Sequence, residues 1–406
     1  MPHSHPSSLN VLVIGAGMGG LSAALAFQQQ GHRVRVIERV ETIRPVGAAI
    51  SLWSNGVKVM HQLGLGSTIE KLSGSMDHMR YLSHGGQVLT DFSLTPLFEE
   101  VNQRACPIAR AALQQTLLDA VGAEHIQLGR TCTDYTQNAD GITAHFDDGE
   151  SLTADILVVA DGTHSRLRKK IVGHAVERQY VGYVNWNVRV PADTSLAPLT
   201  YWDQYVGEAK RVSFMPMGSG GNHENAQEFY CFFDVPLPAG TPNDPNHYRD
   251  ELREHFAGWA APVQALIEGF DPARMARVEI HDIAPLESLT APRVALLGDA
   301  AHGMAPDLGQ GGCQAMEDAW VLANAVQQAL ESESDSAQAI AKGLADYDEA
   351  RVERVGEIVA RARKRAAMIH GQDLSETHAW YDELAKEDGQ AIIAGLKKTF
   401  TEGPLG

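Results

Sequence analysis

The sequence contains few cysteines, and their spacing shows no pairing. The chain has 406 residues and four cysteines, Cys106, Cys132, Cys231 and Cys313. Disulfide scaffolds and zinc sites both need cysteines at short, regular spacings. We therefore expect four reduced thiols, with neither a disulfide framework nor a metal site.

Positive charge is scarce, and long apolar runs are lacking. The 33 Lys and Arg residues face 51 Asp and Glu residues, which gives a net charge of -18 and argues against binding to nucleic acid. There is no apolar run of membrane-spanning length, and the polar residues 1–8 do not resemble a signal peptide. We expect a cytoplasmic protein of about two domains that spans no membrane.

The segment 293–319, RVALLGDAAHGMAPDLGQGGCQAMEDA, predicts a ligand site between a strand and a helix. The apolar residues Val294 to Leu297 predict a buried strand that ends at Gly298 and Asp299. A loop then leads to Gly309-Gln310-Gly311-Gly312 and to a long predicted helix from Cys313. Glycines let backbone N–H groups approach a ligand, and a helix start favours negative charge. The segment therefore suits a ligand that carries or develops an anion.

The N-terminal region predicts a dinucleotide-binding unit. A strand over Leu9 to Ile14 is followed by GAGMGG at residues 15–20, a helical stretch to Gln30, and a strand over Arg33 to Ile37 that ends at Glu38. An acidic residue about 20 positions after the glycines accepts hydrogen bonds from ribose hydroxyls. The carboxylate of Glu38 favours a free 2′-hydroxyl, as in the AMP half of FAD. The alternative is a glycine-rich turn without a ligand.

A third motif completes a family resemblance. The predicted strand Asp155 to Ala160 leads into DGTHSRLR at residues 161–168, and the three motifs together resemble those of the single-component (class A) flavoprotein monooxygenases. Further similarity, to the members of this family that hydroxylate urate, runs nearly end to end through NGVK, PVGAAIS, YVGYVNWN, RVSFMP, FFDVPLPAG, PDLGQGGCQAMEDA and EGPLG. Two departures are an apolar loop at residues 301–305 and a long segment between Gly218 and Gln227, whose GSGG we interpret as a hairpin tip.

The predicted fold is α/β, with a Rossmann-like FAD-binding domain interleaved with an antiparallel β-sheet substrate domain. We assign residues 1–75, 105–175 and 285–330 to the first domain, and 76–104 and 176–284 to the second. The second contains a predicted hairpin around Gly85-Gly86 and four aromatic-rich strands between Tyr180 and Val235. Residues 331–406 form a C-terminal helical segment, in which Arg351 to Arg365 is a basic amphipathic helix. We expect its solvated face to be exposed while it packs on the cofactor domain, rather than lying on a membrane surface.

The resemblance implies tightly but non-covalently bound FAD and a set of residues that hold it. Asp299 would hold the ribityl chain, residues 309–313 the isoalloxazine, Arg110 the diphosphate, and the backbone of Cys132 the adenine. The full set is Gly15, Gly17, Gly19, Gly20, Glu38, Arg39, Ser51, Arg110, Cys132, Asp161, Asp299, Gly309, Gln310, Gly311, Gly312 and Cys313. Only one dinucleotide fingerprint is present, so NADH would act as a transient co-substrate.

For the substrate, the resemblance implies Arg211, Tyr230 and Asp307. Reduced flavin in this class reacts with O2 to give a C4a-hydroperoxide, which would hydroxylate urate to 5-hydroxyisourate. Arg211 would contact urate and stabilise its anion, Tyr230 would donate a hydrogen bond to it, and Asp307 would position Arg211. Taken singly, each residue also has an ordinary interpretation: Arg211 as a surface charge, Tyr230 as a core residue and Asp307 as a turn residue.

Two alternatives remain open at this stage. The chain could be a hydroxylase of the same class that acts on a hydroxybenzoate-type phenol or a tetracycline-type substrate, because Arg211 and Tyr230 also suit a carboxylate-bearing phenol. It could instead bind flavin without turnover, as a structural or sensing group. The sequence leaves both monomer and homodimer open, and does not decide between NADH and NADPH.

Overall fold

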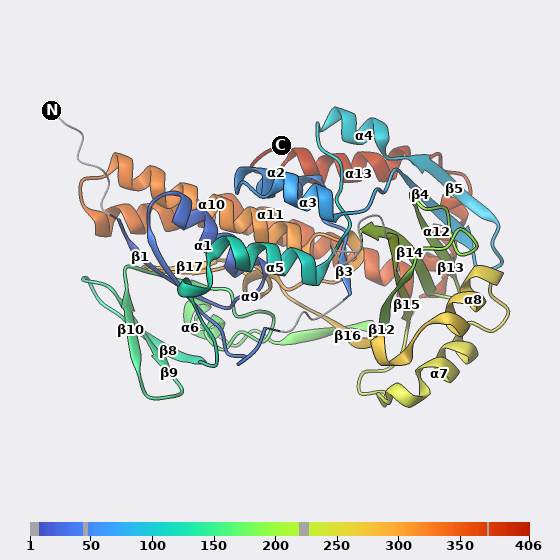
Figure 1. The fold of residues 1–406 in the computed structure, drawn as a ribbon, viewed down its shortest axis with the longest axis horizontal. Coiled ribbons are helices and arrows are strands. Elements are labelled where there is room, and N and C mark those ends of the chain that lie inside the picture. Colours follow the sequence, from blue (N-terminus) through green and yellow to red (C-terminus); the bar gives the residue numbers. More distant parts are fainter. Residues whose placement is uncertain (1–7, 44–47, 219–226, 372) are drawn as a thin grey trace.

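The structure is a computed structural model that describes residues 8–43, 48–218, 227–371 and 373–406. Figure 1 shows two β-sheet regions at opposite ends of the long axis, with helices α10 and α11 running between them. Within the described residues, no helix is both long enough and apolar enough to cross a membrane.

A six-stranded sheet forms the core of the first region. Its order is β17-β18-β11-β1-β2-β7, and every pair is parallel except β17 with β18. The central strands are continuous apolar runs because helices cover such sheets on both faces. The strands are β1 (Asn10–Ile14), β2 (Arg33–Ile37), β7 (Ile126–Gln127), β11 (Ile156–Val159), β17 (Thr290–Ala291) and β18 (Val294–Leu296).

Helices and two small sheets surround this core. Helix α1 packs against both α5 and α10. The helices of this region are α1 (Met18–Gln29), α2 (Ser54–Gln62), α3 (Gly66–Leu72), α5 (Arg110–Val121), α6 (Arg168–Val172), α9 (Asp299–His302) and α10 (Gly311–Ser332), with the short turns η1 (Ala123–His125) and η4 (Pro306–Leu308). The small sheets are β10-β9-β8, from β8 (Cys132–Gln137), β9 (Ile142–Phe146) and β10 (Ser151–Ala154), and the pair β3 (Ala49–Ile50) and β6 (Ile108–Ala109).

A seven-stranded sheet forms the second region, in the order β16-β12-β15-β14-β13-β4-β5. All its pairs are antiparallel except β13 with β4. Its strands are β4 (His78–Ser83), β5 (Val88–Ser93), β12 (Arg178–Pro191), β13 (Tyr201–Gly207), β14 (Lys210–Gly218), β15 (Gln227–Val235) and β16 (Ala276–Ile283). The associated helices are α4 (Thr95–Glu100), α7 (Tyr248–His255) and α8 (Ala261–Gly269), with η2 (Pro245–His247) and η3 (Pro272–Arg274).

The two faces of this sheet differ in chemistry because side chains alternate along each strand. Trp186, Phe214 and Phe233 point to one face and form a core with Leu252 of α7 and Leu266 of α8. Residues one position away along the same strands point to the opposite face, toward the rest of the molecule. That second face includes polar residues, and it forms one side of the candidate site.

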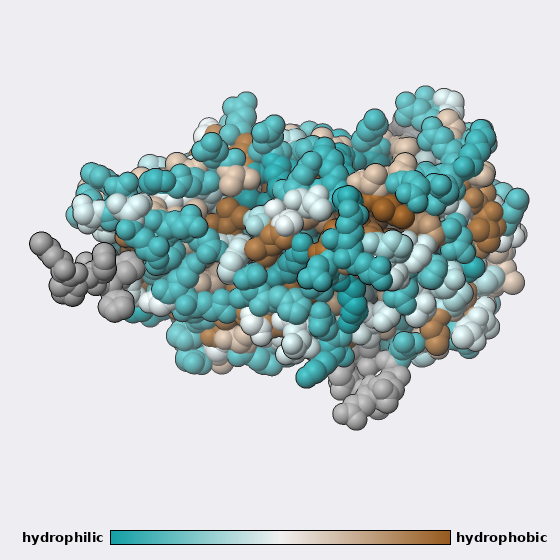
Figure 2. Space-filling model, turned by 90° about the horizontal axis from the view of Figure 1, so that it is seen from above, coloured by the Kyte–Doolittle hydropathy of each residue, from teal (hydrophilic) through white to brown (hydrophobic). Residues whose placement is uncertain are grey.

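Three helices end the chain: α11 (Ser336–His370), α12 (Leu374–Leu384) and α13 (Gln390–Thr401). Helix α11 packs along α10 and reaches β12 and β14 of the large sheet, so it joins the two regions (Figure 1). Arg351 of α11 is buried, which corrects its expected place on an exposed basic face. Figure 2 shows a face on which hydrophilic residues predominate and hydrophobic ones lie in small groups.

The predicted fold class is confirmed. Many of these elements lie where the sequence predicts them, including β1, α1, β2 and the hairpin β4–β5. The long helix predicted from Cys313 begins two residues earlier, as α10 at Gly311, and the short elements α3, α4, α6 and β10 were not predicted. The proposed hairpin tip after Gly218 falls at residues 219–226, outside the described residues. The domain boundaries given above stay a prediction.

Candidate functional site

The glycines after β1 divide into packing residues and one residue that faces open space. Gly15 has a φ of +109°, and an added Cβ there would lie 2.3 Å from the carbonyl oxygen of Ala160. A Cβ on Gly20 would lie 2.0 Å from the carbonyl oxygen of Gly15, and one on Gly19 would lie 2.6 Å from the Leu297 side chain. At Gly17 an added Cβ would meet no described atom within 4 Å. A phosphate group can therefore approach the backbone at Gly17.

A hollow of about 180 Å³ opens beside this turn. The N-terminal glycine motif, the strand β8 and the motif at residues 161–168 all contribute to it, and its lining includes Gly15, Gly17, Glu38, Arg39, Cys132 and Asp161. Glu38 Oε2 accepts a hydrogen bond from the backbone N–H of Ala16 at 2.8 Å, so its carboxylate is held toward the glycine turn. The structure thus brings together residues that lie far apart in the sequence.

Asp161 carries an oxygen that is free to accept a hydrogen bond from a ligand. Its Oδ2 accepts from the backbone N–H of Arg166 at 3.1 Å, but Oδ1 is buried without a partner among the described residues. Burial raises the pKa of Asp161 above its ordinary value. A buried acceptor without a donor is costly, and a ligand hydroxyl would satisfy it. The hollow and this oxygen fit the nucleotide half of FAD.

The loop before α10 forms a second glycine cradle. Gly309 has a φ of +62°, and a Cβ there would lie 2.6 Å from Ser51 Oγ and 2.7 Å from Trp53 Nε1. A Cβ on Gly312 would lie 2.4 Å from the Ile50 side chain. Ser51, predicted only by resemblance, therefore lies against this loop. The N-terminus of α10 opens directly after it, which suits the anionic ring of a reduced flavin.

The remaining predicted cofactor residues flank this cradle or begin a helix. Asp299 is exposed at the start of α9, and an added Cβ on Gly311 would lie 3.9 Å from its Oδ1. Gln310 is buried and accepts a hydrogen bond from Asn55 at 2.9 Å. Cys313 is buried in α10, where burial raises the pKa of its thiol to about 12. Arg110 is exposed as the first residue of α5.

Behind the cradle lies a buried polar network that sequence reasoning missed. Asp318 Oδ2 accepts hydrogen bonds from the backbone N–H of Gly298 at 3.0 Å and pairs with His302 Nε2 at 2.7 Å. Its Oδ1 accepts from Arg351 Nε at 2.7 Å, and Arg351 also pairs with Glu317 at 2.7 Å. The only sequence signal was a charged pair, Glu317 and Asp318, in an otherwise apolar helix.

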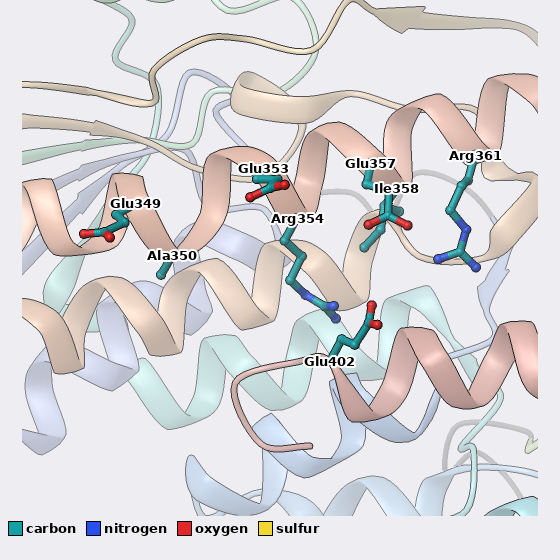
Figure 3. A pocket seen from close by; sticks show the side chains of 8 residues that line it. All are labelled: Glu349, Ala350, Glu353, Arg354, Glu357, Ile358, Arg361 and Glu402. Atoms are coloured by element: carbon teal, nitrogen blue, oxygen red, sulfur yellow. The ribbon is translucent and has the colours of Figure 1, made fainter.

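This network reaches a surface hollow of about 240 Å³ beside α11. Figure 3 shows Arg354 and Glu402 pointing toward one another across it, with Glu349, Glu353 and Glu357 along α11. Arg354 also pairs with Glu317 at 2.8 Å. The hollow is lined by carboxylates and arginines but by none of the predicted site residues, so it is separate from the cofactor cradle.

The structure brings two of the three predicted substrate residues together. Arg211 Nη2 donates a hydrogen bond to Asp307 Oδ1 at 3.0 Å, although one residue belongs to β14 and the other to η4. A second carboxylate, Asp234 of β15, accepts from Arg211 Nε at 2.8 Å. Burial alone would lower the pKa of Arg211, but the two carboxylates raise it, so the guanidinium stays charged.

Tyr230 lies farther along the same sheet face. Asp234 is the direct partner of Arg211, whereas Tyr230 pairs with Met215 four residues along β14. Phe232 stands between them: the Arg211 guanidinium carbon lies 5.2 Å from its ring centroid, and the Tyr230 ring lies 5.5 Å from it. No hydrogen bond joins Tyr230 to Arg211 within the described part of the chain.

Sequence reasoning missed the other residues around Arg211. Tyr183 donates its hydroxyl hydrogen to Asp307 Oδ2 at 2.7 Å, and Asn185 donates to Asp234 Oδ1 at 2.7 Å. His370, the last residue of α11, packs against Tyr183 with the ring centroids 4.2 Å apart and the ring planes tilted by 34°. Tyr183 and Asn185 carried a signal, because they lie in the aromatic-rich strand YVGYVNWN. His370 carried no such signal, because the sequence does not reveal which part of the fold the end of α11 reaches.

Comparison with known proteins agrees with this geometry. The family described as FAD binding domain matches residues 8–362. A FAD-dependent urate hydroxylase of Klebsiella pneumoniae is 48% identical over 399 residues, which cover 98% of this chain and 100% of the relative. A FAD-dependent urate hydroxylase of Mycolicibacterium vanbaalenii is 45% identical over 400 residues, which cover 98% of this chain and 98% of the relative.

Solved structures agree as well. Klebsiella pneumoniae HpxO complexed with FAD and uric acid superposes with a TM-score of 0.91 at 47% identity, covering 98% of both chains. A salicylate hydroxylase in complex with substrate shares the fold, with a TM-score of 0.73 at 24% identity. FAD is therefore the cofactor, and the chain belongs to the family of FAD-dependent urate hydroxylases among the flavoprotein monooxygenases.

Proposed function

We propose that this enzyme converts urate, NADH, O2 and a proton into 5-hydroxyisourate, NAD and water. The observation that carries the proposal is the buried Arg211 guanidinium, held between Asp234 of the large sheet and Asp307 of the flavin loop. A fixed cation next to the flavin suits a planar, acidic substrate. Relatives at 45–48% identity are urate hydroxylases, which supports the choice of urate.

Arg211 is the proposed anchor for urate. Among the described residues it donates through Nε and Nη2 to carboxylates, so Nη1 remains for a ligand. Its positive charge would stabilise the urate anion and make the ring more electron-rich at the carbon to be hydroxylated. Asp307 would fix this guanidinium relative to the flavin, because it belongs to the loop that ends at Gly309.

Tyr230 and the sheet face would orient the ring. The strand register leaves Phe232 between Arg211 and Tyr230, so a planar substrate could lie over Phe232 with one edge at each residue. Burial is the main cause that raises the pKa of Tyr230, and its phenol therefore stays a hydrogen-bond donor. Bound FAD supplies the electrons from NADH and the activation of O2.

The test is a paired absorbance measurement on the purified, FAD-loaded protein. NADH oxidation is followed with and without urate while urate loss is read in the same cuvette. Matched, urate-dependent loss of both would support the proposal, and FAD-free protein provides the control. NADH oxidation that ignores urate, with urate unchanged, would contradict it and direct the search to hydroxybenzoate-type phenols.

A further inference from the structure

His370 meets the substrate site from the end of α11. Its Nδ1 lies 2.8 Å from the carbonyl oxygen of Ala209, in the turn between β13 and β14. Its Nε2 lies 3.6 Å from Asp234 Oδ2 and 3.9 Å from Asp307 Oδ1. The side chains of His370 and both aspartates are at most 1% exposed. One imidazole edge therefore faces both carboxylates that hold Arg211.

The hydrogen bond to Ala209 decides the form of the ring. A carbonyl oxygen only accepts, so Nδ1 must carry a hydrogen. In a neutral imidazole Nε2 would then present a lone pair to two carboxylates, which is repulsive. An imidazolium presents an N–H there instead, and each negative charge favours it. The geometry therefore matches the doubly protonated ring.

The net charge of the buried groups around Arg211 depends on whether the His370 ring is neutral or an imidazolium. Arg211 contributes one positive charge against the two negative charges of Asp234 and Asp307. Tyr183 remains neutral, because burial and the two carboxylates raise its pKa well above the ordinary value. With neutral His370 the buried set carries one net negative charge, and with the imidazolium it is balanced. An anionic substrate would be repelled by the first arrangement and accepted by the second.

We propose that His370 is a positioning residue for substrate binding, held as an imidazolium that balances Asp234 and Asp307 and so leaves the charge of Arg211 available to an anion. The inference rests on the proposed function for the identity of that anion. The groups that face His370 are Asp234 of β15, Asp307 of η4, Tyr183 of β12 and the Ala209 carbonyl, with Arg211 beyond the carboxylates. Loss of the positive charge at His370 weakens urate binding.

The first experiment reads the ring directly and needs no turnover. The FAD-loaded protein is labelled with ¹⁵N-histidine, and the His370 signals are identified by their loss in His370→Gln. We expect both ring nitrogens to be protonated at pH 7. A ring protonated only at Nδ1 would overturn the proposal, whatever the enzyme does with urate.

The second experiment measures the KM for urate between pH 6 and pH 9 in wild type, His370→Gln and His370→Asn. Gln places an amide near Nε2, and Asn places one near Nδ1, where it can still donate to Ala209. At low pH we expect both variants to raise the KM roughly tenfold, since a buried charge is lost, and to flatten its rise with pH. His378→Gln is the matched control, because His378 is exposed on α12.

The outcomes separate the two proposals. Variants that lower thermal stability but keep the wild-type dependence of KM on pH would show a merely structural His370 and overturn the inference. A wild type that consumes no urate would contradict the proposed function instead, while the ¹⁵N spectrum still decides the protonation of His370.

Discussion

At the scale of single residues, Arg211 is the cation on which the proposed substrate site depends. It is 5% exposed and lies between two carboxylates that are themselves fully buried. Removing one partner of such a group leaves uncompensated charge, at a cost of about 3–5 kcal/mol. An amide of similar length keeps part of the hydrogen bonding and removes the charge. This makes Arg211→Gln the informative substitution.

We expect Arg211→Gln to retain FAD and flavin reduction while uncoupling NADH oxidation from urate hydroxylation. Arg211 contacts the sheet and the loop residue Asp307, and none of the glycines of either cradle, so cofactor binding should survive. The ratio of urate lost to NADH oxidised should fall at least roughly tenfold, because the anion is no longer held. Arg253→Gln is the matched control, since Arg253 is exposed on α7, which covers the other face of the large sheet, and pairs with Glu268. Loss of FAD from Arg211→Gln would show that Arg211 serves the cofactor instead.

How far sequence predicts the site depends on what decides each residue's position. Asp307 could be placed because it lies within the flavin motif itself. Asp234 ends an apolar strand and could not be distinguished from a turn residue, because its role depends on the β14–β15 register. His370 is fixed only by the length of α11 and by its packing on α10. Pair geometry across strands and between distant helices is a tertiary property, and one sequence does not encode it locally.

At the scale of elements, the β1–turn–α1 unit separates packing from binding within four glycines. Gly15 and Gly20 are needed for the close approach of α1 to β1 and β11, whereas Gly17 faces the hollow beside Glu38. The motif and its context could be predicted from sequence with almost the correct boundaries. The difference between the glycines could not, because it depends on which atoms lie opposite each one.

Gly17→Ala and Gly20→Ala should therefore fail in different ways. We expect Gly17→Ala to change the free energy of unfolding of the FAD-free protein by less than about 1 kcal/mol and to weaken FAD binding, because its methyl occupies the phosphate approach. Gly20→Ala places a methyl 2.0 Å from a carbonyl oxygen and should prevent normal folding. Urea unfolding and FAD titration measure the two effects. Equal destabilisation by both substitutions would contradict this division.

Helices α10 and α11 are joined by the buried polar network around Asp318. Asp318 holds the Gly298 turn and His302 at one end and Arg351 at the other. Burial by itself raises the pKa of Asp318, but His302 and Arg351 outweigh it and lower that pKa to about 2. The ionised form is thus favoured in the folded protein, and its stabilisation is present above the ordinary pKa of an aspartate.

This shift predicts how stability depends on pH. The contribution of Asp318, about 2 kcal/mol, should be complete above pH 4 and lost as the pH falls through about 2. The difference in free energy of unfolding between wild type and Asp318→Asn should therefore shrink as the pH is lowered from 4 toward 2. Asp140→Asn is the control, since Asp140 is exposed and its carboxylate accepts no hydrogen bond from the described residues. A difference that stays constant over this range would show that Asp318 is not held as an anion by the network.

At the scale of the whole molecule, the C-terminal helix α13 lies behind the loop that precedes α10. Helix α13 packs on α2, and the Phe400 ring lies 5.6 Å from the Trp53 ring. Trp53 in turn lies against Gly309, so the end of the chain supports the flavin loop from behind. Amphipathic periodicity predicts that the C-terminal helices form. The place where α13 packs could not be predicted, because it depends on packing between residues at opposite ends of the sequence.

Phe400→Ala should therefore weaken both folding and cofactor binding. The cavity left by a 1%-exposed phenylalanine should cost about 3–5 kcal/mol, and a looser Trp53 should lower the affinity for FAD. FAD at about 100 times its Kd stabilises the wild type by about 2.7 kcal/mol, and at the same FAD concentration the variant should gain less. Urea unfolding with and without FAD measures both, with the exposed Thr401→Ala as the control. If Phe400→Ala lost stability but kept the full gain from FAD, α13 would belong to the core and have no part in holding the cofactor.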